Sequence, residues 1–138
     1  MRAIIDTNIV LDYFLSREQN AVEADKLFEL ILNEKFEAFI TANCVTDIYF
    51  IVSKTLGEKI ARDTTKKLLQ LFEIIAVDGE DCSSALDLPM DDFEDALVVT
   101  CADKVFIDCI ISNDKKFMEI NESLAKVVDY KGFFDLIN

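Results

Sequence analysis

Short apolar runs rich in β-branched residues alternate along the chain with longer segments of mixed polarity. We expect strands at residues 2–5, 37–41, 73–77, 107–112 and 126–128. Short apolar runs bounded by polar residues are typical of buried parallel strands. Parallel strands need helical crossovers, and the segments between the runs are long enough to provide them. The pattern predicts an α/β fold, specifically a three-layer α/β/α sandwich around a mainly parallel sheet.

The intervening segments show the periodicity of amphipathic helices. We expect helices at residues 8–15, 17–33, 43–56, 58–72, 81–86 and 130–137, and another that begins at residue 91. Asn43 and Asp91 are expected to cap their helices, and Glu94 should complete a capping box. The expected inward-facing residues include Val22, Leu27, Leu30, Ile31, Leu68, Leu69 and Phe72.

Composition narrows the class of protein. The chain has 138 residues, of which 51% are hydrophobic, with 3 glycines and 1 proline. Such a chain can bury a core, and its length suits a single domain over residues 1–138. No apolar stretch approaches the ~20 residues of a membrane span, and nothing resembles a secretory signal. We therefore expect a cytoplasmic protein in which Cys44, Cys82, Cys101 and Cys109 are structural thiols.

Charge and the absence of histidine restrict the chemistry. The formal net charge is −13 and there is no histidine, which excludes a histidine general base and imidazole ligands for zinc. An acidic protein also repels nucleic acid unless metal ions or a local basic surface reverse the sign. Any catalytic chemistry must therefore depend on carboxylates.

Four separate segments can deliver a carboxylate to one edge of the sheet. Asp6 follows the first strand and Asp114 follows the strand at 107–112. Asp47 and Asp95 fall in the first turns of helices that begin at the same edge, where open α/β sheets keep their sites. The alternative is that these are unrelated caps and turn residues, which is the usual role of a single such Asp.

Carboxylates crowded at one place repel one another, and a divalent cation removes the conflict. Oxygen-only ligands select hard ions, so the expected cofactor is Mg²⁺ or Mn²⁺. Ions held by carboxylates suit phosphodiester hydrolysis, because they activate water and stabilise the leaving oxygen without a side-chain nucleophile.

The same segments resemble the signatures of the PIN-domain family. They are Ile5-Asp6-Thr7-Asn8, Thr46-Asp47-Ile48-Tyr49, Asp92-Phe93-Glu94-Asp95-Ala96-Leu97 and Ser112-Asn113-Asp114-Lys115-Lys116-Phe117. Their order and spacing agree with the family over essentially the whole chain. The resemblance implies an α/β/α fold and a Mg²⁺- or Mn²⁺-dependent endoribonuclease. For small free-standing members of the VapC type it also implies the toxin of a type II toxin–antitoxin pair, with an antitoxin partner and often a homodimer.

The resemblance also suggests roles for individual residues. Asp6, Asp47, Asp95 and Asp114 match the family's acids, and Thr7, Asn8 and Ser112 match the polar residues that support them. Many members have Glu where this chain has Asp47, so the contact of Asp47 with metal could run through water. Asp92 could support the site or simply favour a helix N-terminus. Lys115, next to Asp114, is a candidate for substrate binding.

Other functions are compatible with parts of this pattern. A non-catalytic PIN-fold module that binds protein or RNA, or an RNA-processing PIN nuclease without an antitoxin, would share the fold. An aspartyl-phosphate phosphatase is disfavoured because Asn8 stands where its second Asp is expected. We expect Asp12 to be an exposed helix residue and the aromatic residues Tyr49, Phe50, Phe93 and Phe117 to belong to the core.

Overall fold

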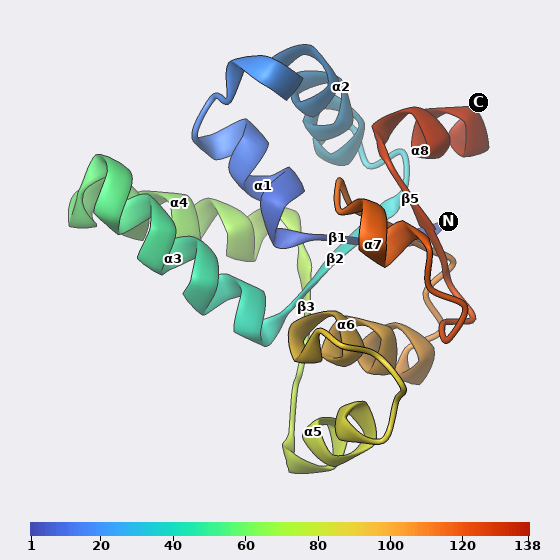
Figure 1. The fold of residues 1–138 in the computed structure, drawn as a ribbon. Helices are drawn as coiled ribbons and strands as arrows, with labels where there is room; N and C mark the ends of the chain where they lie inside the picture. The colour runs from blue at the N-terminus through green and yellow to red at the C-terminus, as the bar shows by residue number, and fades with distance from the viewer.

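The computed structural model describes residues 1–138 as a five-stranded sheet with helices on both faces (Figure 1). The strand order is β3-β2-β1-β4-β5, and every neighbouring pair is parallel. The strands are β1 (Arg2–Ile5), β2 (Glu37–Thr41), β3 (Glu73–Ile75), β4 (Cys109–Ile111) and β5 (Lys126–Val128). The predicted α/β sandwich with a parallel sheet is confirmed, although β3 and β4 are shorter than expected.

The helices connect these strands in chain order. They are α1 (Thr7–Phe14), the 3₁₀ helix η1 (Glu18–Asn20), α2 (Ala21–Leu32), α3 (Ala42–Leu56), α4 (Glu58–Leu71), α5 (Gly79–Leu86), α6 (Phe93–Lys104), α7 (Lys115–Met118) and α8 (Tyr130–Ile137). None of them combines the length and the apolar character that crossing a membrane requires.

The strand β1 lies at the centre of the sheet. Ile4 pairs with Phe39 of β2 on one side and with Ile110 of β4 on the other. Beyond the strand, the N–H of Asp6 donates to the carbonyl of Ile111 over 2.9 Å. Because all strands are parallel, their carboxyl ends lie at one edge, and the chain segments that leave β1, β2 and β4 begin there.

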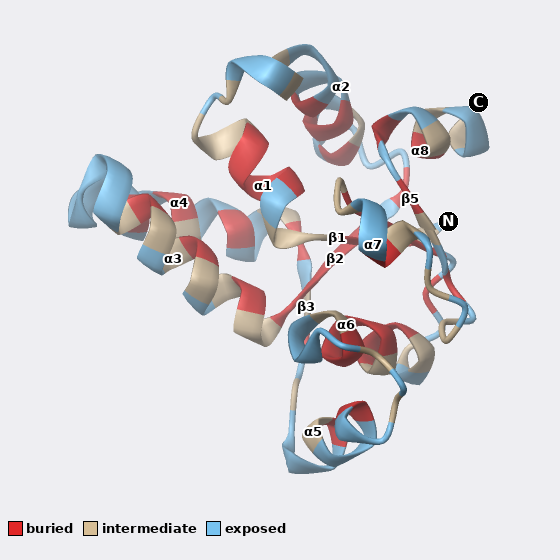
Figure 2. Cartoon of the chain, in the orientation of Figure 1, coloured by how far each residue is buried: buried red, intermediate tan, exposed pale blue.

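Alternate residues of the strands build two cores, one on each face of the sheet. Ile5 and Ile111 pack with residues of α1, α2, α3, α4 and α8. Ile4 and Ile110 pack on the other face with residues of α6 and α7, and Ala85 of α5 packs against α6. Figure 2 shows buried positions along the strands and on the inner sides of the helices. A buried aliphatic side chain contributes about 2 kcal/mol to stability, so these two faces hold the layers together.

A tight reversal joins α3 to α4. Gly57 ends α3 with a φ of 93°, a left-handed value that favours glycine, and α4 begins at the next residue. The sequence correctly predicts that Gly57 ends the helix. The two helices form a hairpin that projects beside the sheet (Figure 1).

Several predicted helix starts are wrong. The strand β2 runs directly into α3, so Thr41 is the N-cap and Asn43 lies inside the first turn. The N-cap of α6 is Asp92 and not Asp91, which precedes it. Asp92 has an extended backbone, and its side chain accepts from the N–H of Asp95. Glu94 therefore lies in the first turn of α6 and forms no capping box with Asp91.

The first helices also differ from the prediction. Ser16 has a left-handed φ of 49°, which separates α1 from η1 and delays the start of α2 to residue 21. The inner face of α2 consequently includes Phe28, whereas Val22 is 77% exposed. The sequence prediction of an inward-facing Val22 is therefore wrong.

Several other residues predicted to lie inside are exposed. Leu69, Phe50 and Phe93 have 57%, 56% and 42% of their surface exposed, while Phe117 is fully buried as predicted. Phe50 belongs to the projecting hairpin and Phe93 to the first turn of α6, where no neighbouring layer covers them. The cysteines agree with expectation, because all four are free and only Cys82 is less than fully buried.

The most buried acid is Asp12 of α1, which is only 2% exposed, so the prediction of an exposed residue is wrong. Its Oδ2 accepts hydrogen bonds from Asn20 Nδ2 at 3.1 Å, Asn113 Nδ2 at 3.0 Å and the Tyr130 hydroxyl at 2.9 Å. Arg17 lies 3.6 Å from its other oxygen. Asp12 thus joins α1 to η1, to the loop after β4 and to α8.

Replacing Asp12 by Ala should lower the free energy of unfolding by about 3 kcal/mol, because it leaves several buried donors without an acceptor. The measurement is urea denaturation followed by circular dichroism. The exposed Asp135, which pairs only with Lys131, offers a matched control whose replacement should cost less than about 0.5 kcal/mol. Equal midpoints for the two variants would contradict the structural role of Asp12.

Candidate functional site

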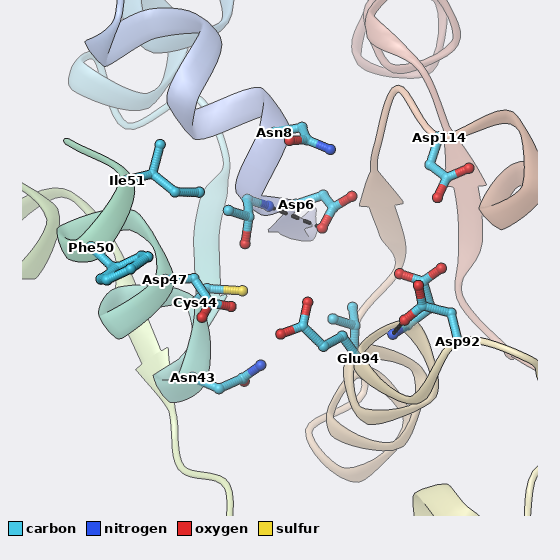
Figure 3. Close-up of a pocket in the computed structure, with 13 residues that line it drawn as sticks. Asp6, Asn8, Asn43, Cys44, Asp47, Phe50, Ile51, Asp92, Glu94 and Asp114 are labelled. Carbon is cyan, nitrogen blue, oxygen red and sulfur yellow. Dashed lines mark hydrogen bonds between the residues drawn. The ribbon is translucent and has the colours of Figure 1, made fainter. Parts of the chain in front are cut away.

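A cavity of about 350 Å³ opens where the central strands end (Figure 3). Its lining includes six acidic side chains from four separate segments of the chain: Asp6, Asp47, Asp92, Glu94, Asp95 and Asp114. The structure thus brings together all four acids that the sequence singles out. Thr7, Asn8 and Asp92 of the expected supporting set also line the cavity, while Ser112 lies buried behind Asp6.

Asp6 is the most firmly held of these acids. It follows β1, and one oxygen accepts from the N–H of Thr7 at 2.9 Å while the other accepts from the Ser112 hydroxyl at 2.7 Å. The Ser112 oxygen in turn accepts from the N–H of Asp114 at 3.1 Å. Burial raises the pKa of Asp6, the two hydrogen bonds partly offset that rise, and the nearby acids add to it.

Asp95 is placed by the N-terminus of α6. Its N–H is held by the capping side chain of Asp92 at 3.1 Å, but its own carboxylate receives no hydrogen bond from the protein. Burial raises the pKa of Asp95 to about 7, with further repulsion from Asp92, Asp6 and Asp114. Acidic side chains therefore surround this carboxylate, and no lysine or arginine lines the cavity to balance their charge.

Asp114 lies at the start of α7, a single turn that the sequence does not reveal. One oxygen accepts from the N–H of Lys116 at 2.9 Å, which caps this turn. Lys115 is exposed and does not line the acidic cavity. Lys116 lines an adjoining cavity together with Asp92, Asp95 and Asp114. The candidate role of Lys115 in substrate binding therefore gains no geometric support.

Asp47 and Glu94 extend toward each other from opposite walls of the cavity (Figure 3). Burial, followed by the charge of Asp47, raises the pKa of Glu94. Sequence reasoning assigned Glu94 to a cap and missed its place in the cavity. The available signal was its position next to Asp95, in the first turn of a helix that begins at the site edge.

The wall formed by α3 contributes two further polar groups. Asn43 extends toward the cavity, and its Oδ1 is buried without a hydrogen-bond partner (Figure 3). Cys44 accepts a hydrogen bond from the Thr41 hydroxyl at 3.1 Å, and burial raises the pKa of its thiol. A neutral thiol cannot balance the carboxylates, so this wall adds no positive charge.

The chemistry of this donor set is that of a site for a hard cation. Carboxylate and amide oxygens dominate the lining, and no lysine, arginine or histidine is present in it. As the side chains stand, no three acidic or thiol groups lie close enough together to hold an ion. Binding an ion would therefore require the side chains to draw together from their present rotamers.

The raised pKa of Asp95 gives a prediction for the protein without metal. A carboxyl whose pKa rises from 3.8 to about 7 on folding binds more protons in the folded state, so stability should fall as pH rises between these two values. Carboxyl NMR should show one group titrating near pH 7. Asp95→Asn should remove that titration and flatten the decline, whereas Asp135→Asn should leave both unchanged. An ordinary carboxyl titration at residue 95 would contradict the prediction.

Comparison with known proteins places this geometry in a family. The family model described as "PIN domain" matches residues 2–116. "Ribonuclease VapC1" of Aquifex aeolicus is 27% identical over 121 residues, which are 84% of this chain and 83% of that protein.

Two solved structures share the fold. One is the DNA-bound VapBC of Salmonella typhimurium, with a TM-score of 0.69, 11% identity and 94% and 98% of the two chains covered. The other is VapC20 of Mycobacterium tuberculosis, described as a sarcin-ricin loop cleaving toxin, with a TM-score of 0.68, 13% identity and 83% and 92% covered. The family-model match extends from β1 into α7 and includes every acid of the cavity, so the chain belongs to the PIN domain family.

Proposed function

We propose that the protein is a Mg²⁺- or Mn²⁺-dependent endoribonuclease that hydrolyses RNA phosphodiester bonds in the acidic cavity. The observation that carries the proposal is the gathering of six carboxylates from distant segments at the carboxyl ends of the central strands. The relative named "Ribonuclease VapC1" supports the reaction class. The solved VapC20, described as cleaving the sarcin-ricin loop, has the same fold.

Asp6, Asp95, Asp114 and Asp47 are the proposed catalytic residues and ligands. Asp6 is pre-oriented by Ser112 and Thr7, and Asp114 is tied to the same Ser112 oxygen. No group of the protein donates a hydrogen bond to the Asp95 carboxylate, so its charge is available to a cation. Asn8, which lines the cavity, can donate its amide N–H to a phosphate oxygen.

When bound, Mg²⁺ or Mn²⁺ would supply an activated water and neutralise charge on the phosphate. Because no histidine is present to activate a hydroxyl nucleophile, we propose that water attacks the phosphate directly. Asp47 and Glu94 extend into the cavity from opposite walls, so we propose that together they can contact a bound ion. We propose that Glu94 supplements Asp47, which is one methylene shorter than the Glu of many family members.

We also propose that the protein is the toxin of a type II toxin–antitoxin pair and works in the cytoplasm. Solved neighbours of the same fold include VapBC from Salmonella typhimurium and Rickettsia felis and a toxin–antitoxin complex from Klebsiella pneumoniae. An antitoxin that offers Arg or Lys to the acidic cavity would neutralise it by charged hydrogen bonds. A homodimer is compatible with the exposed apolar side chains Phe50, Leu56 and Ile60 of the projecting hairpin.

The nuclease proposal predicts different responses of activity and stability to the same substitution. Asp6→Asn and Asp95→Asn should each lower kcat for RNA cleavage in Mn²⁺ by at least ~10²-fold. Calorimetry should show a matching loss of Mn²⁺ affinity. Thermal unfolding of Asp95→Asn without metal should occur at the same or a higher temperature, because one crowded charge has been removed and no hydrogen bond to this carboxylate is lost.

The control for these variants is Asp81→Asn. Asp81 is buried, but its side chain completes the capping box of α5 by accepting from the N–H of Asp78, pairs with Lys104 at 2.6 Å and does not line the cavity. This variant should lose stability and keep Mn²⁺ affinity. Unchanged Mn²⁺ binding in Asp6→Asn would instead favour a PIN-fold module without catalysis.

The antitoxin proposal has its own test. If the gene lies beside a frame encoding a small DNA-binding protein with a basic C-terminal tail, that protein should form a complex and suppress RNA cleavage. Replacing the basic tail residues with Ala should restore cleavage without dissociating the complex. Full cleavage activity in the intact complex would refute inhibition through the cavity.

A further inference from the structure

A second cavity of about 420 Å³ adjoins the acidic one, between α1, η1 and the loop after β4. No apolar residue lines it; its lining consists of Asn8, Asp12, Arg17, Gln19, Asn20, Asn113 and Asp114. Asn8 and Asp114 line both cavities, so the two share a boundary. A strand whose phosphate lies at the acids would place a neighbouring nucleotide here, and the volume suits a small ligand.

The buried Asp12 fixes the orientation of two amides in this cavity. An ionised carboxylate only accepts hydrogen bonds, so Asn20 and Asn113 must both turn their Nδ2 groups toward it, at 3.1 and 3.0 Å. Their Oδ1 atoms then face away from Asp12, and neither accepts a hydrogen bond from the protein. The cavity therefore presents two oriented acceptors, which suit the hydroxyl and amino donors of a nucleotide.

Arg17 gives the cavity its only positive charge and is the only cation that lines either cavity. Its guanidinium lies 3.6 Å from Asp12, and its side chain is 40% exposed, so most of its five donors remain available. The left-handed Ser16 and the hydrogen bond from the N–H of Arg17 to the carbonyl of Asp12, at 3.0 Å, fix the backbone at this point. A guanidinium so held suits a phosphate.

We propose that this cavity binds the nucleotide of the RNA strand adjacent to the scissile bond. Arg17 contacts its phosphate, while the Oδ1 atoms of Asn20 and Asn113 accept from its 2′-hydroxyl or base. This inference rests on the proposed ribonuclease function. It gives an acidic protein a local means of holding a polyanion, and its acceptors distinguish RNA from DNA through the 2′-hydroxyl.

The first test is steady-state cleavage of a short RNA in Mn²⁺ by Arg17→Met. KM should rise about tenfold, the loss expected for one charged hydrogen bond, while kcat changes little. Arg17→Lys keeps the charge beside Asp12 and should recover part of the loss. Lys35→Met removes the same charge on the opposite edge of the sheet and should leave KM unchanged. Calorimetry should show equal Mn²⁺ affinity in all four proteins.

The second test combines a substitution in the protein with removal of a 2′-hydroxyl from the RNA, to show whether Asn20 contacts that hydroxyl. Single 2′-deoxy substitutions on either side of the cleaved bond should reveal one position at which wild-type KM rises by about threefold. In Asn20→Ala the same deoxy substitution should have no further effect. Independent effects of the two changes at every position would overturn the role of the amide, and circular dichroism checks that Asn20→Ala stays folded.

The outcomes separate this inference from the ribonuclease function. If the wild type cleaves RNA but Arg17→Met matches Lys35→Met in KM, the nucleotide site is wrong and the nuclease stands. If the wild type does not cleave RNA, the nuclease proposal fails. Fluorescence anisotropy of labelled RNA in Mn²⁺ then tests whether the cavity binds a nucleotide. About tenfold weaker RNA binding by Arg17→Met supports the nucleotide site, and unchanged RNA binding overturns it.

Discussion

The hydrogen bond from the Ser112 hydroxyl to Asp6, 2.7 Å long, connects the ends of the two central strands. Ser112 also accepts from the N–H of Asp114, so one buried oxygen sets the relative positions of two acids that are 108 positions apart in sequence. The parallel register of β1 and β4 makes this contact possible, because Ile5 and Ile111 are directly paired. The rest of the cavity is arranged around this fixed point by the helices that start at the same edge.

Parts of this arrangement follow from the sequence and parts do not. Local sequence and the pattern of apolar residues predict the strands, the position of Asp6 after β1 and the parallel topology. These features suffice to predict that four acids share one edge of the sheet. Asp12 could not be identified this way, because its burial depends on Asn113 and Tyr130, which are more than 100 positions away. Glu94 was missed because capping and site lining use the same residue types at the same helix end.

The exposed aromatic residues show the same limit. Phe50 and Phe93 are large apolar side chains that the sequence analysis assigns to the core, yet no element covers them in the folded chain. Phe117 lies between the charged residues Lys116 and Glu119 but is fully buried, because residues of β5 and α6 pack around its single helical turn. Helical periodicity indicates which face is apolar, but the neighbours that cover this face are set by the topology of the whole sheet.

The acids of the protein fall into two groups according to the donors that reach them. Asp12 receives three hydrogen bonds and lies beside Arg17, and Asp81 is paired with Lys104, which lowers the pKa of the Asp81 carboxyl. Asp95, in contrast, receives none, and its pKa rises to about 7. The chain therefore has the means to neutralise a buried carboxylate and does so where the role is structural. At the ends of the central strands it leaves the Asp95 carboxylate without a partner, at a cost in stability that protonation relieves and that the proposed divalent cation would offset.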